Sequence, residues 1–160
     1  MPCDVCNTGQ KVIAETREHQ QLVASIMCKL AAELMQRGVE HDASKLREPE
    51  LSWFLRYTPK LKDTTYGSDE YKQYLEELGP ALKAHYHNNR HHPEHYQDGI
   101  RGMTLIDLLE MLVDWIAATA RHEDGDILRS LKINEKRFDI PPELAHILRE
   151  TVAQIMALKG

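Results

Sequence analysis

The stretch TLIDLLEMLVDWIAATARH, residues 104–122, constrains the fold of this chain more than any other segment. Leucine, isoleucine, valine and methionine cover most of the circumference of the helix that it predicts, with Thr104 as a suitable N-terminal cap. A helix that is apolar almost all round is usually buried. We therefore expect this helix to lie in the core.

The rest of the chain also shows helical spacing rather than the alternation typical of strands. Apolar residues recur at helical spacing from Val12 to Met35, and Gly38 is a natural stop for that helix. The segments 59–67 and 90–102 are expected to be loops. The other predicted helices cover residues 41–57 in two pieces around Pro49, 68–89 with a kink near Gly79 and Pro80, 126–138 and 141–159.

These patterns predict an all-α fold, a compact single-domain bundle of five to seven helices over residues 11–160. A chain of 160 residues is long enough to bury one sizeable core. Residues 1–10 are expected to form a flexible N-terminus.

Charge and hydropathy exclude several partners. The net charge is -5, and charges of both signs are spread along the chain, so we expect no duplex nucleic acid as a partner. No apolar run approaches the roughly 18 residues that cross a bilayer, and the first residues lack the apolar core of a signal peptide. We expect a cytoplasmic protein that does not bind membranes.

The three cysteines, Cys3, Cys6 and Cys28, do not predict a disulfide framework. Cys3 and Cys6 form a CxxC motif, but no second CxxC follows that would complete a zinc site with cysteine alone. A frayed, reduced N-terminus is the favoured interpretation, and the role of the pair stays open.

The predicted central helix carries a narrow acidic stripe. Asp107, Glu110 and Asp114 fall within roughly 60° of one another around its axis. A buried carboxylate needs a cation or a hydrogen-bonded partner, because leaving it unpaired costs several kcal/mol. The stripe therefore either binds a cation or forms salt bridges, for which Arg101 and Arg121 are candidates.

Two further signals are weak when taken alone. His19 lies on the apolar face of the first predicted helix, where a histidine is more often a core residue than a ligand. His41 and Asp42 are adjacent just after Gly38, and Asp42 is equally consistent with a helix cap.

Together these residues occur in the order His19, His41–Asp42 and Asp114, within an all-α chain. This order resembles the HD-domain superfamily of metal-dependent phosphohydrolases. The stretches HDASK, NRHHPEH and LIDLLEMLVDW are also similar to a family of small, largely uncharacterised phage and bacterial proteins within or near that superfamily. The resemblance implies that the four residues hold one divalent metal (Mn, Fe, Co, Ni, Zn or Mg), with Asp42 placed to share a second ion.

The sequence HYHNNRHHPEH contains five of the nine histidines. Some HD-domain proteins hold a second metal with two additional histidines, and the candidates here are His85 with either His91 or His92. Alternatively, His91 and His92 bind the substrate phosphate, or the whole stretch is a polar surface loop. His87 and His95 are expected on the surface.

Three other residues complete the predicted site. Lys45 follows Asp42 by three residues and can neutralise a phosphate. Glu110 lies one helical turn before Asp114 and is the expected base that activates water, so Asp42, Lys45 and Glu110 are the predicted catalytic residues. Arg121 is expected either to clamp the phosphate or to pair with Asp114.

We therefore expect a metal-dependent phosphohydrolase that acts on a small phosphate ester, and the resemblance suggests a nucleotide. One alternative is an HD-fold di-iron oxygenase. A second is a non-catalytic helical interaction module that binds metal structurally. Trp53, Phe54 and Trp115 could supply an aromatic patch for a homo-oligomer.

Overall fold

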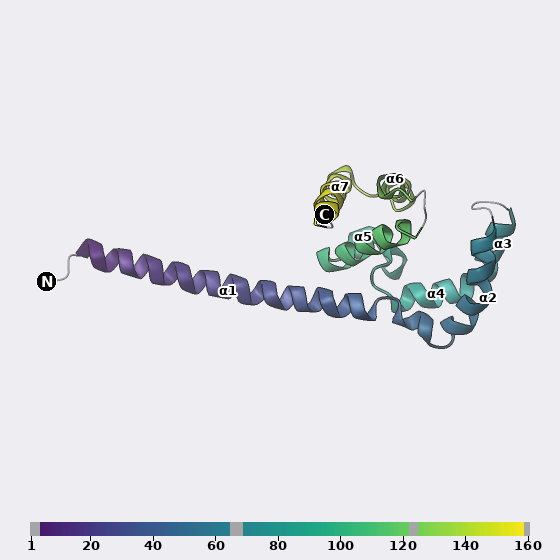
Figure 1. Cartoon of the computed structure of the whole chain (residues 1–160), viewed down its shortest axis with the longest axis horizontal. Helices are drawn as coiled ribbons and strands as arrows, with labels where there is room; N and C mark the ends of the chain where they lie inside the picture. The colour runs from purple at the N-terminus through teal and green to yellow at the C-terminus, as the bar shows by residue number, and fades with distance from the viewer. Residues whose placement is uncertain (1–3, 65–68, 122–124, 159–160) are drawn as a thin grey trace. The chain divides into compact units, whose positions relative to one another are not determined.

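The computed structural model describes residues 4–64, 69–121 and 125–158, and within these ranges it contains helices and no strand (Figure 1). This confirms the predicted all-α fold. Short 3-10 helices are η1 (Ala43–Leu46), η2 (Pro93–His95) and η3 (Gly99–Gly102). The α-helices are α1 (Asp4–Glu40), α2 (Glu50–Asp63), α3 (Asp69–Glu77), α4 (Gly79–Asn88), α5 (Leu105–Thr119), α6 (Ile127–Arg137) and α7 (Pro142–Ala157).

The chain divides into two compact units, Met1–Glu40 and His41–Gly160, where the sequence analysis expected one domain over residues 11–160. The first unit consists of the long helix α1. Its apolar side chains are largely exposed, as Leu22 at 60% and Ile26 at 50% illustrate. Helical spacing of apolar residues indicates an amphipathic helix, but it does not specify which surface covers the apolar face.

Both predicted ends of the first helix differ from the structure. α1 already includes Asp4, inside the stretch expected to be flexible, and it continues through Gly38 to Glu40. The left-handed backbone that ends many helices falls on Asp42, with φ of 58°, rather than on Gly38. Cys3 lies outside the described residues, and Cys28 is exposed on α1.

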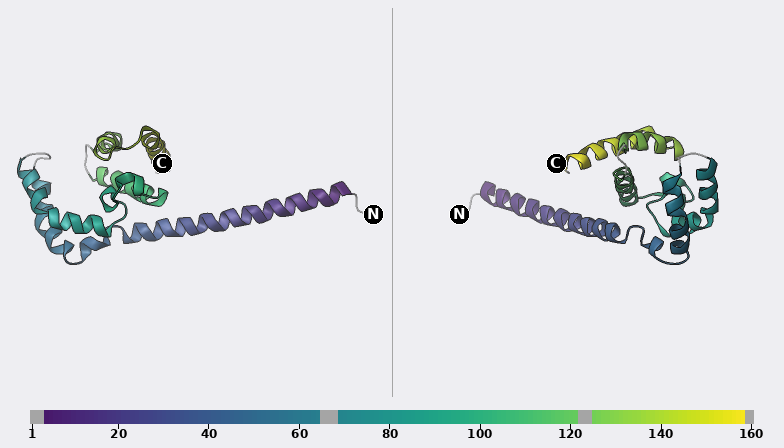
Figure 2. Two further views of the ribbon diagram at one scale, coloured as in Figure 1. Left: turned by 180° about the vertical axis from the view of Figure 1, so that it is seen from behind. Right: turned by 45° about the vertical axis from the view of Figure 1, so that its right-hand side comes forward.

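In the second unit, α5, α6 and α7 pack around the larger core (Figures 1 and 2). α5 begins with a capping box in which the Thr104 hydroxyl accepts from the Asp107 backbone N–H and the Asp107 carboxylate accepts from the Thr104 N–H. This confirms Thr104 as the cap and α5 as a core helix. The buried apolar residues of the core are Ile100, Leu108, Met111, Leu112, Ile116, Leu131, Ile140, Ala145, Leu148 and Val152.

The helices α2, α3 and α4 contact one another around a smaller core of Tyr57, Leu78 and Ala81. The predicted kink near Gly79 is confirmed, because the chain breaks into α3 and α4 at Leu78. The predicted loop from residue 59 is wrong at its start, since α2 continues through Pro59 to Asp63. Pro59 is exposed, so water can satisfy the carbonyl left without its helical N–H partner.

The aromatic residues predicted to form a patch for self-association are partly buried instead. Trp53 and Phe54 pack against the smaller core, and Trp115 packs against the larger one, where its ring stacks on Phe138. Self-association therefore stays a prediction without this patch to support it. Among the described residues, none of the helices combines the length and apolar character of a membrane span.

An ion pair between the exposed Arg90 and the buried Asp107 ties the segment after α4 to α5. The Arg90 guanidinium donates to both carboxylate oxygens of Asp107, at 3.2 and 3.3 Å, and Asp107 is fully buried. The first residue of the acidic stripe thus has a structural partner, which is Arg90 rather than the predicted Arg101. Arg101 lies 3.6 Å from Asp139.

Candidate metal centre

Asp42 occupies the middle of a group of histidines and carboxylates in the second unit. Its left-handed backbone is uncommon outside glycine, and such strain is often found at functional sites. The side chain makes no cap hydrogen bond to η1, so the helix-cap alternative is wrong. Its Oδ1 lies 3.2 Å from His85 Nε2 and 3.6 Å from His91 Nε2, while its Oδ2 lies 3.7 Å from His41 Nε2.

The segment around Pro93 brings three histidines to Asp42. His85 lies in the last turn of α4, and His92 has extended backbone, as expected for a residue before proline. The Nε2 atoms of His85 and His92 are 2.9 Å apart, and both His85 and His91 are 98% buried. The interpretation of this part of the stretch as a polar surface loop is therefore wrong.

α5 supplies the carboxylates on the other side. Asp114 Oδ1 lies 3.4 Å from His41 Nε2. Glu110, one turn earlier, approaches the Nδ1 atoms of His41 and His91 at 3.0 and 3.1 Å. A carboxylate on the Nδ1 side orients an imidazole and leaves Nε2 directed at a metal, which is the usual outer-shell arrangement of metal-binding histidines. The observed contacts of Glu110 are thus those of a positioning residue, whereas its expected role as base stays a prediction.

Glu50 holds the Nδ1 side of His85 in the same way, and its role was not predicted from the sequence. Its side chain is 99% buried at the start of α2, and its carboxylate accepts from His85 Nδ1 at 2.9 Å. The Ser44 hydroxyl and the Asn88 amide also donate to Glu50. A glutamate in the first helical turn after Pro49 was the only sequence signal, and it does not reveal a partner 35 residues away.

Two overlapping groups of potential ligand atoms result, and within each group the atoms all lie within 4.8 Å of one another. Two bonds of roughly 2 Å each can span most of such distances after small side-chain movements. We call the six residues together the cluster site. One group is Asp42, His85, His91 and His92, and the other is His41, His91 and Asp114.

Two buried atoms of the cluster site point to a cation. Among the described residues, Asp42 Oδ1 and His91 Nε2 are buried without any hydrogen-bond partner. Leaving a buried polar atom unsatisfied costs about 1–3 kcal/mol, and more for a charged group. Both atoms are lone-pair donors that face the same space, so a cation fits them better than a hydrogen-bond donor of fixed direction.

In the protein without metal, the pKa values of His41 and Asp42 indicate that the cluster site favours a positive charge. Hydrogen bonds to Asp114 and Glu110 raise the pKa of His41 to about 10. Burial alone would raise the pKa of Asp42, but the nearby His85 imidazole and Lys45 ammonium outweigh it and hold that pKa well below its usual range. Burial, followed by the charges of His91 and His85, lowers the pKa of His92 to about 3. His92 is therefore neutral at pH 7, the state in which an imidazole binds a metal.

Three other residues were predicted to belong to the site: Lys45, Arg121 and His19. Lys45 donates to Asp42 Oδ2 at 2.6 Å, so it lies at the edge of the cluster site. Arg121 is exposed just beyond α5, and in the described part of the chain Asp114 pairs with His41 instead. His19 is exposed on α1, which is described separately, so its membership of the ligand set stays a prediction.

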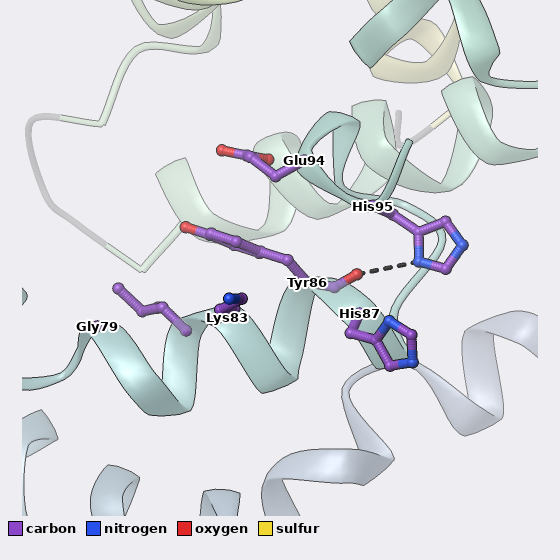
Figure 3. A pocket seen from close by; sticks show the side chains of 7 residues that line it. Gly79, Lys83, Tyr86, His87, Glu94 and His95 are labelled. Atoms are coloured by element: carbon purple, nitrogen blue, oxygen red, sulfur yellow. Dashed lines mark hydrogen bonds between the residues drawn. The ribbon is translucent and has the colours of Figure 1, made fainter. Parts of the chain in front are cut away.

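His87 and His95 lie outside the cluster site, at a pocket of about 430 Å³ lined by residues of α4 and η2 (Figure 3). The His95 Nδ1 atom is 3.0 Å from the carbonyl oxygen of Tyr86, and the two imidazole centroids are 6.4 Å apart. Tyr86 lines this pocket and also contacts the cluster site, since its ring centroid lies 4.9 Å from that of His92.

The fold and the cluster site define an all-α protein with a compact set of imidazole and carboxylate groups suited to metal binding. The chain belongs to a family of unknown function (DUF5662), whose family model matches residues 8–157. Comparison with curated proteins and with solved structures found no match.

Proposed function

We propose that this protein is a metal-dependent hydrolase of small phosphate esters, and that the cluster site is its active site. The observation that carries the proposal is the pair of buried, unpartnered lone-pair donors, Asp42 Oδ1 and His91 Nε2. Asp42 belongs to one of the two overlapping ligand groups and His91 to both. Because an imidazole nitrogen has one lone pair, His91 would bind one ion, whereas the Asp42 carboxylate, with Oδ1 facing His91 and Oδ2 3.7 Å from His41 Nε2, could bridge two. The order of these residues along the chain also resembles the HD-domain superfamily.

The donor set suits a divalent transition metal. Imidazole and carboxylate ligands bind Mn²⁺, Fe²⁺, Co²⁺, Ni²⁺ and Zn²⁺. Glu50 and Glu110 contribute by fixing the orientation of the imidazoles through their Nδ1 atoms. A metal in such a site lowers the pKa of a water and screens the charge of a phosphate.

Hydrolysis of a phosphate ester forms one bond from the water oxygen to phosphorus and breaks the bond between phosphorus and the ester oxygen. The leaving alcohol takes up a proton. Lys45, at the edge of the cluster site, is placed to neutralise a phosphate oxygen, although its ammonium pairs with Asp42 in this structure. A nucleotide as substrate rests on the resemblance alone.

Metal analysis of the purified protein tests this proposal. We expect one or two equivalents of a divalent metal and release of phosphate from a panel of phosphate esters, nucleotides included, with Mn²⁺, Co²⁺ or Mg²⁺. Protein that contains the metal but releases no phosphate from any ester would reject the hydrolase and leave a structural metal site.

A di-iron oxygenase is the second candidate, because four imidazoles and two carboxylates in overlapping groups also suit a pair of irons. The two candidates differ in metal identity. Two irons per chain with a mixed-valence signal would favour the oxygenase, whereas activity restored by Mn²⁺ or Co²⁺ would favour hydrolysis.

A further inference from the structure

An apolar cavity of about 350 Å³ lies next to the cluster site. The lining residues that the structure describes come from η1 and α2, and Leu46 and Leu55 among them are 75% and 68% exposed. Its volume is near the lower end of the range for small-molecule sites, which is about 300–1,000 Å³. The residues that line it are Lys45, Leu46, Leu51, Phe54, Leu55, Thr58 and Pro59.

Two side chains join this cavity to the cluster site. The Lys45 ammonium lies 2.6 Å from Asp42 Oδ2 and 5.1 Å from the centroid of the Phe54 ring. The Phe54 ring in turn meets the His85 imidazole edge-on, with centroids 5.7 Å apart. A ligand that places an anionic group at Lys45 can therefore extend its organic group over Phe54 into the cavity.

We infer that this cavity holds the organic group of the phosphate substrate and that this group is apolar, an alkyl or aryl group rather than a nucleoside. The inference rests on the proposed function and specifies its substrate class. The polar groups that the lining side chains provide are the Lys45 ammonium and the Thr58 hydroxyl. A nucleobase and sugar would bring several donors and acceptors against leucines and a proline, and each group left unpaired there would weaken binding.

Charge complementarity determines which end of the cavity the phosphate group of the substrate occupies. The ammonium at one end of the cavity and the metal-ligand groups beyond it favour a phosphate at that end. The opposite end, formed by leucines and Pro59, favours hydrocarbon. Burying an alkyl chain there gains affinity in proportion to the apolar area that it removes from water.

The test measures binding of two phosphonates, which cannot be hydrolysed, to the full chain loaded with Mn²⁺. By calorimetry, we expect hexylphosphonate to bind about tenfold or more tightly than methylphosphonate, because it carries five additional carbons. Leu55→Asp should reduce this ratio several-fold, since it places a charge at the rim, and the high exposure of Leu55 makes the exchange compatible with folding.

Leu128→Asp is the matched control, because Leu128 is 58% exposed on α6 and is not among the residues that line this cavity. It should keep the wild-type ratio. The inference would be overturned if the wild type bound the two phosphonates with equal affinity. It would also be overturned if Leu55→Asp kept the wild-type ratio of the two affinities.

The same panel separates the inference from the proposed function. Preference for hexylphosphonate without hydrolysis of any ester would support the cavity and reject the hydrolase. Hydrolysis of nucleoside monophosphates, with equal binding of the two phosphonates, would support the hydrolase and reject the apolar substrate. If neither phosphonate binds the metal-loaded chain, the inference is wrong.

Discussion

The cluster site takes three of its four histidines, and the pocket of Figure 3 both of its histidines, from the same eleven residues, yet the two regions differ in the physical properties that matter for metal binding. His85 and His91 are buried, each has a carboxylate behind Nδ1, and each directs Nε2 at Asp42. His87 is exposed, and the Nδ1 atom of His95 faces a backbone carbonyl.

The comparison shows that a dense run of histidines does not identify ligands by itself. What distinguishes the cluster site is the carboxylate that fixes each of the rings of His41, His85 and His91, together with the unpartnered atoms Asp42 Oδ1 and His91 Nε2.

Replacing Asp42 by Asn should remove nearly all bound metal and all activity. Asp42 contributes to contacts with His41, His85 and His91, and asparagine tolerates the left-handed backbone at this position. Metal content measured by mass spectrometry checks the prediction, and circular dichroism checks that helical content is kept. A folded variant that retains a full equivalent of metal would contradict the assignment.

His91→Ala should lower metal stoichiometry and kcat/KM strongly, because His91 belongs to both ligand groups. His95→Ala and His87→Ala are the matched controls from the same stretch, and each should stay within about threefold of wild type, less than about 1 kcal/mol in the barrier. Similar losses of metal and of kcat/KM in all three variants, or no loss in any of them, would contradict the distinction between the two regions.

Glu110→Gln should weaken metal affinity by about 10- to 100-fold while leaving the ligands in place, the range typical of lost outer-shell partners. The amide keeps the shape of the side chain but is a weaker acceptor for the Nδ1–H groups of His41 and His91. Titration with a competing chelator measures the change. An unchanged affinity together with a large loss of kcat would instead support Glu110 as the base.

The metal-free protein should be most stable near pH 6.5. The pKa of His92 is lowered to about 3, so below pH 6.5 the unfolded chain takes up a proton that the folded chain does not, and stability falls as pH falls. The pKa of His41 is raised to about 10, so its contribution is complete below pH 6.5 and is lost as pH rises towards 10.

Urea unfolding in the presence of a chelator measures how the free energy of unfolding falls on the acidic and on the alkaline side of pH 6.5. Each histidine contributes to this free energy a change of at most about 1.4 kcal/mol per pH unit. His92→Asn should reduce the loss of stability below pH 6.5, and His41→Asn should reduce the loss of stability above it. If both variants keep the wild-type pH profile, the two imidazoles are not in the charge states that their surroundings indicate.

The parts of the fold that could be predicted were those fixed by local pattern. The apolar circumference and cap of α5 are contiguous in sequence, and the spacing of Glu110 and Asp114 places both on one helix face. His41, Asp42, Asp114 and the candidates His85, His91 and His92 were identified because they match a known order of residue types, and the structure brings all six together.

What was missed depends on distant packing. Glu50 is 35 residues from His85 and is buried by tertiary contacts, and Arg90 meets Asp107 across a turn that no local pattern specifies. The helix end expected at Gly38 falls after Glu40, because the left-handed residue is Asp42, whose side chain serves the cluster site instead of a cap.

Anomalous diffraction from crystals of the full chain grown with Co²⁺ tests the central claim most directly. The account predicts a strong peak roughly 2 Å from His91 Nε2 and from an oxygen of Asp42 or Asp114, with a second peak if the site holds two ions. A peak only between His87 and His95, or no peak among the six residues of the cluster site, would contradict it.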